Sequence, residues 1–100
     1  MDRSRVLTLI AVTYTSDAIG QQIPTENRRD VFCNVSSISG SEWLNAGKAG
    51  LNPEYRVTMF SPDYQGEQIA ELDGVRYGIY RTYLGRNESI ELYLERKAGV

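Results

Sequence analysis

The sequence predicts an all-β protein with one short helix, folded as a small antiparallel β-barrel of about six strands. Short runs of alternating apolar and polar residues, rich in β-branched and aromatic side chains, recur along most of the chain. The pair Asp73-Gly74 lies between two such runs and is a strong short-range hairpin signal. Antiparallel strands in this number close into a barrel or fold into a sandwich. With 100 residues, we take 1–100 as a single β-barrel domain.

The first predicted strand covers residues 5–15 and is apolar on both faces. Its two sets of side chains are Val6, Ile10, Val12 and Tyr14 on one face, and Leu7, Leu9 and Ala11 on the other. Such a strand is either buried on both sides or has an outer face that meets a partner. In a chain this small the second explanation gains weight, because a domain of this length buries only about two-thirds of its unfolded surface.

Residues 16–30 are expected to form a long loop or an extended flexible hairpin between the first two strands. The segment is polar, and Ile19 and Ile23 have no sequence neighbours that would bury them. Composition alone favours a solvated flexible loop. The alternative is a segment that becomes ordered on a partner, since long loops in compact domains are usually functional or disordered.

The one convincing helix signal covers residues 39–50, between the second and third predicted strands. Ser39 and Glu42 have capping-box spacing: the Ser39 hydroxyl accepts a first-turn N–H, and the Glu42 carboxylate reaches back to the N-cap N–H. Gly47 and Gly50 are both candidates for a left-handed C-cap, and Pro53 prevents continuation. The short apolar face consists of Trp43, Leu44 and Ala46. We expect the single tryptophan to anchor this helix on the barrel.

The remaining strands follow from alternation and turn residues. They are expected at residues 30–38, 55–61, 67–72, 75–84 and 89–96, with a short tail at 97–100. The strand at 30–38 should point Val31, Cys33 and Val35 to one face. The strand at 75–84 should point Val75, Tyr77 and Ile79 away from Arg76, Gly78 and Tyr80. The last strand should point Ile90, Leu92 and Leu94 inward and Glu91, Tyr93 and Glu95 outward.

Composition excludes several classes of function. The net charge of −2, from 11 basic and 13 acidic residues, does not suggest a general nucleic-acid or membrane-surface binder. Histidine is absent and Cys33 is the only cysteine, which excludes zinc sites and Ser-His or Cys-His catalysis. The apolar run at residues 6–12 is too short to span a membrane, and we expect no export signal. A lone cysteine fits a reducing compartment. We expect no cofactor and no catalytic residues.

Two patterns have competing explanations. Glu67 and Glu71, or Glu91 and Glu95, share strand faces, and a solvated face explains them better than a catalytic carboxylate pair. Seven tyrosines with arginines nearby could stack single-stranded bases. Tyrosine is also favoured at protein interfaces, and the glutamates of the last strand offset the positive charge, so we place a protein interface first.

The order of several stretches carries a resemblance that spans about residues 5–95. The stretches are 15–23 with its Asp17-x-x-Gly20 loop, 29–37, the helix with Ser41-Glu42-Trp43, Gly50-Leu51-Asn52-Pro53, and Tyr77-Gly78-Ile79-Tyr80-Arg81. In this order they resemble the head closure, or head–tail joining, family of long-tailed bacteriophages and prophages, the stopper-type proteins of the connector.

The resemblance implies a β-barrel subunit of a homo-oligomeric ring, twelve-fold when assembled, in the virion and, before that, in the host cytoplasm. The alternative for the free subunit is a monomer that forms the ring only on the adaptor. The ring would lie beneath the portal and adaptor proteins, close the packaged head, touch passing double-stranded DNA and dock tail proteins. A loop that projects into the channel or onto the neighbouring ring would here be 16–30, with interface residues Asp17, Ile19, Gly20, Gln22, Ile23 and Pro24. The helix residues expected near neighbouring subunits are Glu42, Trp43 and Leu44. The residues that match structural motifs are Ser39, Gly50, Pro53, Tyr77 and Arg81.

Three alternatives stay open at this point. A tail terminator or tail-completion protein is similarly small and β-rich. An oligonucleotide-binding-type barrel would show salt-sensitive affinity for single strands. A carboxylate-dependent enzyme would need two carboxylates that converge in a cleft.

Overall fold

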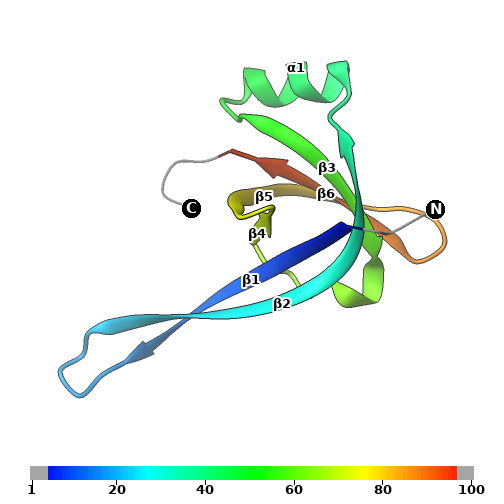
Figure 1. The fold of residues 1–100 in the computed structure, drawn as a ribbon. Helices are drawn as coiled ribbons and strands as arrows, with labels where there is room; N and C mark the ends of the chain where they lie inside the picture. The colour runs from blue at the N-terminus through cyan, green and yellow to red at the C-terminus, as the bar shows by residue number, and fades with distance from the viewer. Residues whose placement is uncertain (1–4, 97–100) are drawn as a thin grey trace.

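The computed structural model describes residues 5–96 and contains six antiparallel strands and one α-helix (Figure 1). The strands are β1 (Arg5–Ser16), β2 (Gln22–Ser37), β3 (Pro53–Phe60), β4 (Ile69–Leu72), β5 (Val75–Leu84) and β6 (Ser89–Glu95). The helix α1 (Gly40–Lys48) lies between β2 and β3, and the 3-10 turn η1 (Ser61–Asp63) follows β3. The predicted fold class is confirmed. The expected tail at 97–100 lies outside the described residues.

The sheet closes on itself in the order β1-β2-β3-β6-β5-β4, because β4 pairs with β1 as well as with β5. Alternate residues of every strand point inward and fill the interior. The buried core consists of Leu7, Leu9, Val31, Cys33, Val57, Met59, Ala70, Leu72, Tyr77, Ile90, Leu92 and Leu94. The inward alternation predicted for the second and last strands is confirmed. Closure leaves the outer faces of the strands, the helix and the loops for contact with other molecules.

The segment 16–30 is a β-ribbon, so the expectation of a long loop is wrong and the hairpin alternative is confirmed. β1 and β2 pair without interruption from Arg5↔Cys33 to Ser16↔Gln22, and only residues 17–21 form the loop. Sequence reasoning missed these strands because a two-stranded ribbon outside the core needs no apolar face. Its polar alternation therefore has the composition of a loop.

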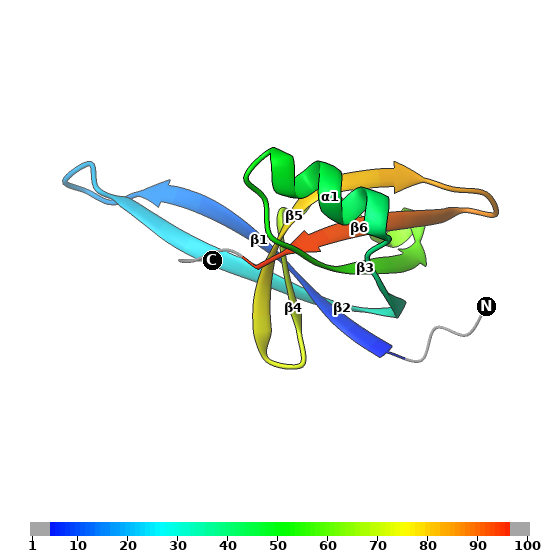
Figure 2. The same cartoon turned by 90° about the horizontal axis from the view of Figure 1, so that it is seen from above.

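This ribbon projects well beyond the barrel (Figures 1 and 2). β4 pairs with β1 only at residues 8–10, and β3 pairs with β2 only at residues 33–37. We define residues 11–27 as the arm. Six register pairs at about 3.3 Å rise each carry the arm roughly 20 Å past the last contact of β1 with β4. The arm accounts for the elongated dimensions of the molecule, 48 × 30 × 23 Å.

The groups that cover the outer face of β1 explain why the sequence of this strand is apolar on both faces. Ile10 points outward, opposite to Leu9, and yet it is fully buried. An ion pair between Arg28 of β2 and Glu71 of β4 crosses over β1 beside Ile10. The middle of the strand is thus buried on both sides, the outer side beneath charged side chains whose stems cover apolar surface.

The ends of α1 follow the sequence signals closely. Ser39 is the N-cap, and its hydroxyl accepts the N–H of Glu42 at 3.2 Å. Of the two candidate glycines, Gly50 adopts the left-handed conformation, with φ of 82°. The N–H of Leu51 donates to the carbonyl of Ala46 at 3.0 Å, and the N–H of Gly50 donates to the carbonyl of Gly47 at 3.0 Å. These two bonds form a Schellman motif.

The hairpin between β4 and β5 also has the predicted turn. Asp73 and Gly74 both have positive φ, 52° and 78°, as a type I′ turn requires. Leu72 and Val75 are register partners on either side of the turn. The Asp-Gly pair therefore sets the register with which β4 and β5 close the barrel.

Candidate functional site

The tip of the arm is a structured turn built on Asp17. One carboxylate oxygen of Asp17 accepts the backbone N–H of Ile19 at 3.0 Å and that of Gln21 at 2.8 Å. The Asp17 N–H donates to the carbonyl of Gln21 at 2.9 Å, and the Gly20 N–H donates to the carbonyl of Asp17 at 3.1 Å. Gly20 has a φ of 84°, which explains why glycine follows three residues after aspartate. Asp17 and Gly20 therefore have a structural role in the turn and are not ligand-binding residues.

Three large apolar side chains of the arm are exposed. Ile19 lies at the apex with 79% of its surface exposed, and Ile23 and Tyr14 are exposed along the ribbon. Ile23 pairs with Thr15 and Tyr14 pairs with Pro24, so the two exposed side chains lie on opposite faces. Gln22 is exposed beside them. The expected interface residues therefore lie together on the arm, beyond the cover of the barrel.

Pro24 occupies a position of the ladder where proline costs no hydrogen bond. Register positions alternate between bonded and non-bonded pairs, and residues 17 and 21 form a bonded pair. From this bonded pair, the next pairs along the ladder are 16 with 22 (non-bonded), 15 with 23 (bonded) and Tyr14 with Pro24 (non-bonded). In a non-bonded pair the backbone nitrogen points away from the partner strand, so the nitrogen of Pro24 faces away from β1. Pro24 therefore removes a donor from the outer edge of β2 and leaves the ribbon intact.

The root of the arm is held by charged side chains. Glu26 accepts two hydrogen bonds from the guanidinium of Arg76 on β5, both at 2.7 Å. These bonds lower the pKa of Glu26 below its ordinary value, against the opposing effect of burial. Because Arg76 belongs to the opposite part of the barrel wall, the paired carboxylate ties the direction of the arm to the body of the protein.

The arm itself carries two acidic residues, Asp17 and Glu26, and no lysine or arginine.

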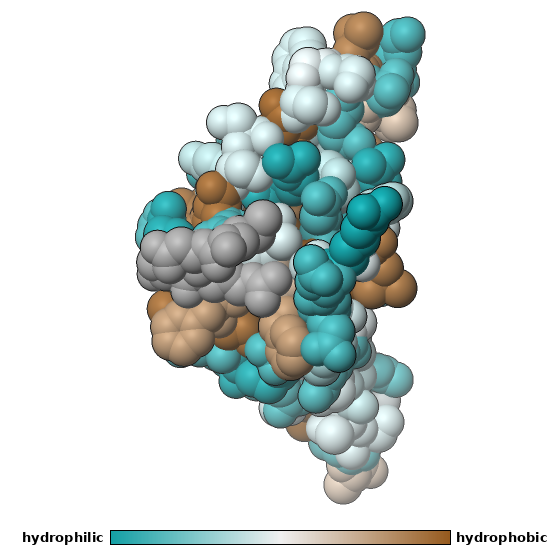
Figure 3. All heavy atoms as spheres, turned by 90° about the vertical axis from the view of Figure 1, so that its right-hand side faces the viewer, coloured by the Kyte–Doolittle hydropathy of each residue, from teal (hydrophilic) through white to brown (hydrophobic). Residues whose placement is uncertain are grey.

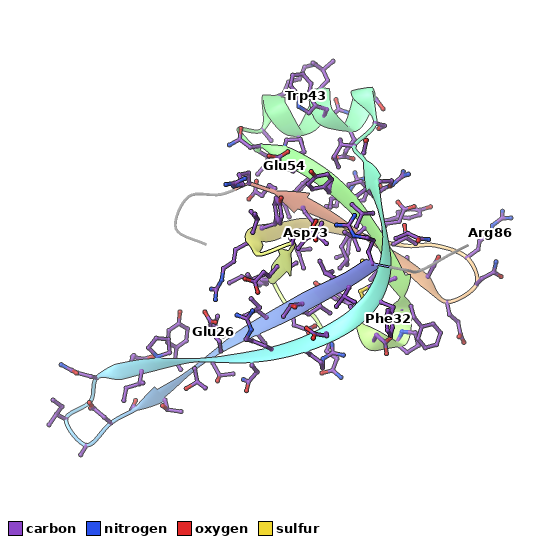
Figure 4. All side chains as sticks on the ribbon, in the orientation of Figure 1. Glu26, Phe32, Trp43, Glu54, Asp73 and Arg86 are labelled. Atoms are coloured by element: carbon purple, nitrogen blue, oxygen red, sulfur yellow. The ribbon has the colours of Figure 1, made fainter. Side chains whose placement is uncertain are left out.

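The helix is held on the barrel by Glu42, and the expectation that Trp43 anchors it is wrong. Trp43 is 60% exposed and Leu44 is also exposed, whereas Ala46 is the buried residue of α1 (Figure 4). The carboxylate of Glu42 accepts the hydroxyl of Tyr80 at 3.1 Å and pairs with the guanidinium of Arg81 at 2.8 Å. Trp43 points outward because the side of a two-turn helix that faces the barrel is filled by these smaller and polar groups.

The same geometry corrects the capping-box prediction. Glu42 reaches across to β5 instead of back to the N-cap N–H, so only the Ser39 half of the box forms. Burial raises the pKa of the Tyr80 hydroxyl, and its hydrogen bond to Glu42 raises it further. Tyr80 therefore stays a neutral hydrogen-bond donor to Glu42 throughout the physiological pH range.

Strict alternation along β5 would place Tyr80 and Arg81 on opposite faces, and a β-bulge brings them together. Ile79 pairs with Leu94 and Arg81 pairs with Tyr93, so Tyr80 is an extra residue in the ladder. Arg81 lies over the ring of Tyr93 at 4.4 Å from the centroid. Sequence periodicity contains no signal for a single inserted residue, which is why the cluster was not predicted.

The outer face of β6 is consequently more covered than predicted. Tyr93 and Glu95 were expected to be outward and solvated, yet both are buried. Tyr93 packs beside Tyr80, with 6.1 Å between ring centroids. Figure 2 shows α1 lying over β5 and β6, the strands that carry these two residues. The hydroxyl of Tyr93 donates to Glu91 at 2.8 Å.

A second carboxylate, Glu67, is buried rather than solvated, which also corrects the sequence analysis. Only 7% of its surface is exposed. It accepts the guanidinium of Arg29 at 2.6 Å and the N–H of Gln65 at 2.8 Å, while Arg29 also donates to the carbonyl of Asp63. Burial alone would raise the pKa of Glu67, but these bonds outweigh it and lower the pKa. Glu71, which was considered with Glu67 as a catalytic pair and judged less well explained that way, pairs with Arg28, so the two carboxylates do not converge.

The remaining motif residues have structural positions. Tyr77 is part of the core and packs edge-on against Tyr55, with 5.8 Å between centroids. Pro53 begins β3 and pairs with Glu95 ahead of a bulge.

Beside Pro53, a cleft of about 370 Å³ separates α1 from the chain that follows it. The lining residues are Trp43, Gly47, Gly50, Leu51, Asn52, Pro53 and Glu54.

Two searches within residues 5–96, for metal-binding clusters and for membrane-spanning helices, give negative results. Within them, no three cysteine, aspartate or glutamate side chains gather closely enough to hold a metal ion. The helix that the structure describes is neither long nor apolar enough to cross a membrane. Neither a scan against protein-family models nor a search of curated proteins matches this chain.

Proposed function

We propose that this protein is a structural subunit of a phage head–tail connector. Copies of it would form a ring beneath the portal and adaptor, close the DNA-filled head and offer a docking surface to the tail. The observation that carries the proposal is the arm, a ribbon whose turn is fixed by Asp17 and whose apex, Ile19, is exposed. An ordered projection with uncovered apolar side chains suits contact with another protein. The resemblance carried by the order of the sequence motifs supports the choice of a head–tail connector as that assembly.

The charge of the arm favours a role in which DNA slides past the arm over a role in which the arm binds the DNA. Residues 11–27 contain two carboxylates and no basic residue. Affinity for DNA comes chiefly from neutralising phosphates with lysine and arginine, which the arm does not offer. An arm of this kind in a channel would block or line the path of the DNA without binding its phosphate backbone.

An oligonucleotide-binding role receives less support from the same side chains. Tyr77 and Tyr93 are buried, Tyr80 is bonded to Glu42, and the hydroxyl of Tyr64 donates to the carbonyl of Glu67. Four of the seven tyrosines are therefore occupied in the fold. Five arginines are paired with carboxylates, namely Arg5, Arg28, Arg29, Arg76 and Arg81. Paired guanidinium groups attract phosphates weakly because their charge is already compensated.

Sedimentation velocity tests the proposal directly. The purified protein is run alone and with a candidate portal–adaptor complex, and we expect it to co-sediment with that complex at a ring-like stoichiometry. Ile19→Asp should abolish co-sedimentation because it places a charge at the apex of the arm. Leu84→Asp, a matched change at an aliphatic side chain that is 68% exposed away from the arm, should co-sediment normally.

Other outcomes would redirect the assignment. Binding to isolated tail tubes but not to the portal–adaptor complex would support the tail terminator or tail-completion alternative. Failure to bind either assembly, together with salt-sensitive affinity for single-stranded oligonucleotides, would overturn the connector proposal.

A further inference from the structure

One end of the barrel opens into a cavity of about 250 Å³. On the outer face shown in Figure 3, by contrast, hydrophobic groups are scattered among hydrophilic ones. Side chains from five strands line the cavity, where β1, β3 and β5 begin and where β2 and β4 end. In a closed sheet of antiparallel strands these positions form one mouth of the barrel. The mouths of β-barrels are among the places where proteins bind small molecules.

Part of the cavity lining is apolar. Leu72 is buried, and Val35 and Val75 are half-buried where they pack against the core. Tyr55 and Tyr77 complete this part, with 5.8 Å between ring centroids and 86° between ring planes. An apolar cavity of about 150 Å³ is enough for a benzene ring. The mouth therefore has room for one aromatic ring and a short polar group.

The hydroxyl of Tyr77 is a hydrogen-bond donor that the fold does not use. Tyr77 lines the cavity and is only 5% exposed. The hydroxyls of Tyr64, Tyr80 and Tyr93 each donate to a protein oxygen, whereas that of Tyr77 has no such partner within residues 5–96. Burial raises the pKa of Tyr77, so its hydroxyl keeps the proton. A buried hydroxyl without a partner is costly, which favours an acceptor supplied by a bound molecule.

Arg5 places a second donor at the rim of the same cavity. Its guanidinium pairs with Asp73 in the turn between β4 and β5, and the two side chains are 45% and 75% exposed. Figure 4 shows Asp73 near the centre of the view, between β1 and β3. Exposed ion pairs contribute little to stability, so this pair can open at small cost. The planar guanidinium then offers the arrangement of donors that matches a carboxylate.

We propose that this mouth of the barrel binds a small aromatic carboxylate, with its ring against the apolar lining and its carboxylate between Arg5 and Tyr77. Both groups are donors, and the ligand would take the place that Asp73 now occupies on Arg5. A cationic ligand would instead meet the positive charge of Arg5 at the rim. The site goes beyond the proposed function and does not depend on the assembly to which the protein belongs.

Benzoate is the probe, titrated into the full ¹⁵N-labelled chain and followed by amide chemical shifts. We expect saturable shifts at residues 5, 35 and 72–77, with a dissociation constant on the order of 1–10 mM, as suits so small a ligand. Benzamide and benzylamine carry the same ring with a neutral and a cationic group. Benzamide should bind several-fold more weakly than benzoate, and benzylamine should leave these residues unshifted.

Three substitutions separate recognition from folding. Tyr77→Phe removes only the hydroxyl and should weaken benzoate binding about ten-fold, because a hydrogen bond to a charged group is lost. Tyr83→Phe, at an exposed tyrosine of the same strand, should leave the affinity unchanged. Asp73→Asn keeps a residue that suits the type I′ turn and removes the carboxylate that competes for Arg5. Its affinity for benzoate should rise several-fold, a gain that a damaged fold would not produce.

Circular dichroism checks that each variant is folded, and Asp73→Asn decides the matter if Tyr77→Phe is not. The inference is overturned if wild-type protein shows no saturable shifts at the mouth, or if benzamide or benzylamine binds as well as benzoate. Unchanged affinity in folded Tyr77→Phe, or no gain in Asp73→Asn, would also overturn it. These titrations use the free protein, so their result and that of the co-sedimentation test are independent.

Discussion

Replacing Arg29 by methionine is expected to destabilise the protein much more than the same replacement at an exposed arginine. Arg29 pairs with Glu67, whose side chain is 6% exposed, and it also donates to the carbonyl of Asp63 in η1. The pair links β2 to the loop that leads into β4. Methionine keeps most of the apolar stem of arginine, so the change removes chiefly the charge and the donors.

The expected loss of stability depends on which charged group of the pair remains after the substitution. Removing one member of a fully buried ion pair costs about 3–5 kcal/mol, because the other charge is left uncompensated. Arg29 itself is 36% exposed, so water can reach part of the site and reduce this cost. We therefore expect Arg29→Met to lower the free energy of unfolding by about 2–3 kcal/mol, a large fraction of the roughly 5–15 kcal/mol of a domain. Glu67→Gln keeps a neutral acceptor for the N–H of Gln65 and should cost about 1.5 kcal/mol.

Urea unfolding followed by far-UV circular dichroism measures these values. Arg5→Met is the matched control, because the Arg5–Asp73 pair is exposed and pairs of that kind contribute about 0–1 kcal/mol. The double variant Arg29→Met, Glu67→Gln should be less destabilised than the sum of the single changes, because the second substitution removes the charge that the first leaves unpaired. Additive effects, or equal losses for Arg29→Met and Arg5→Met, would refute the reasoning.

Two further predictions concern pH and the helix. The folded-state pKa of Glu67 lies below its ordinary value of 4.5, so its contribution is complete above that pH and is lost as the pH falls through the folded value. In urea titrations, wild-type stability should decline more steeply below about pH 4.5 than that of Glu67→Gln; parallel curves would contradict this. Tyr80→Phe removes the 3.1 Å bond to Glu42 and should cost about 1–2 kcal/mol of local stability. Hydrogen exchange should then accelerate in Gly40–Lys48 and not in β6, and unchanged exchange in the helix would count against the anchor.

The barrel could be predicted because its core residues alternate in sequence. Val57, Met59, Leu92 and Leu94 point inward at the spacing of a strand. The turn at Asp73-Gly74 and the cap at Ser39 depend on a few adjacent residues, so local sequence is enough to find them. These features share one property: the information that specifies them lies within one short segment.

The candidate surfaces were harder to predict because they depend on distant partners. Glu42 anchors the helix through residues of β5, and an inserted Tyr80 makes that contact possible. Glu67 is buried by Arg29, which is 38 residues away in the chain. The arm has no core at all, so its strands are specified by pairing rather than by apolar pattern. Trp43 was misplaced because the largest apolar side chain of a short helix was taken to face inward.

Pro24 has a consequence for crowded copies of this protein. A long two-stranded ribbon with free edges invites neighbouring ribbons to join it strand by strand, which leads to open-ended sheets and aggregation. The missing N–H of Pro24 interrupts the outer edge of β2 close to the tip, where ribbons from different copies would first meet. The arm can therefore stay long, ordered and exposed while many copies are packed together, and its association is left to side chains rather than to the backbone.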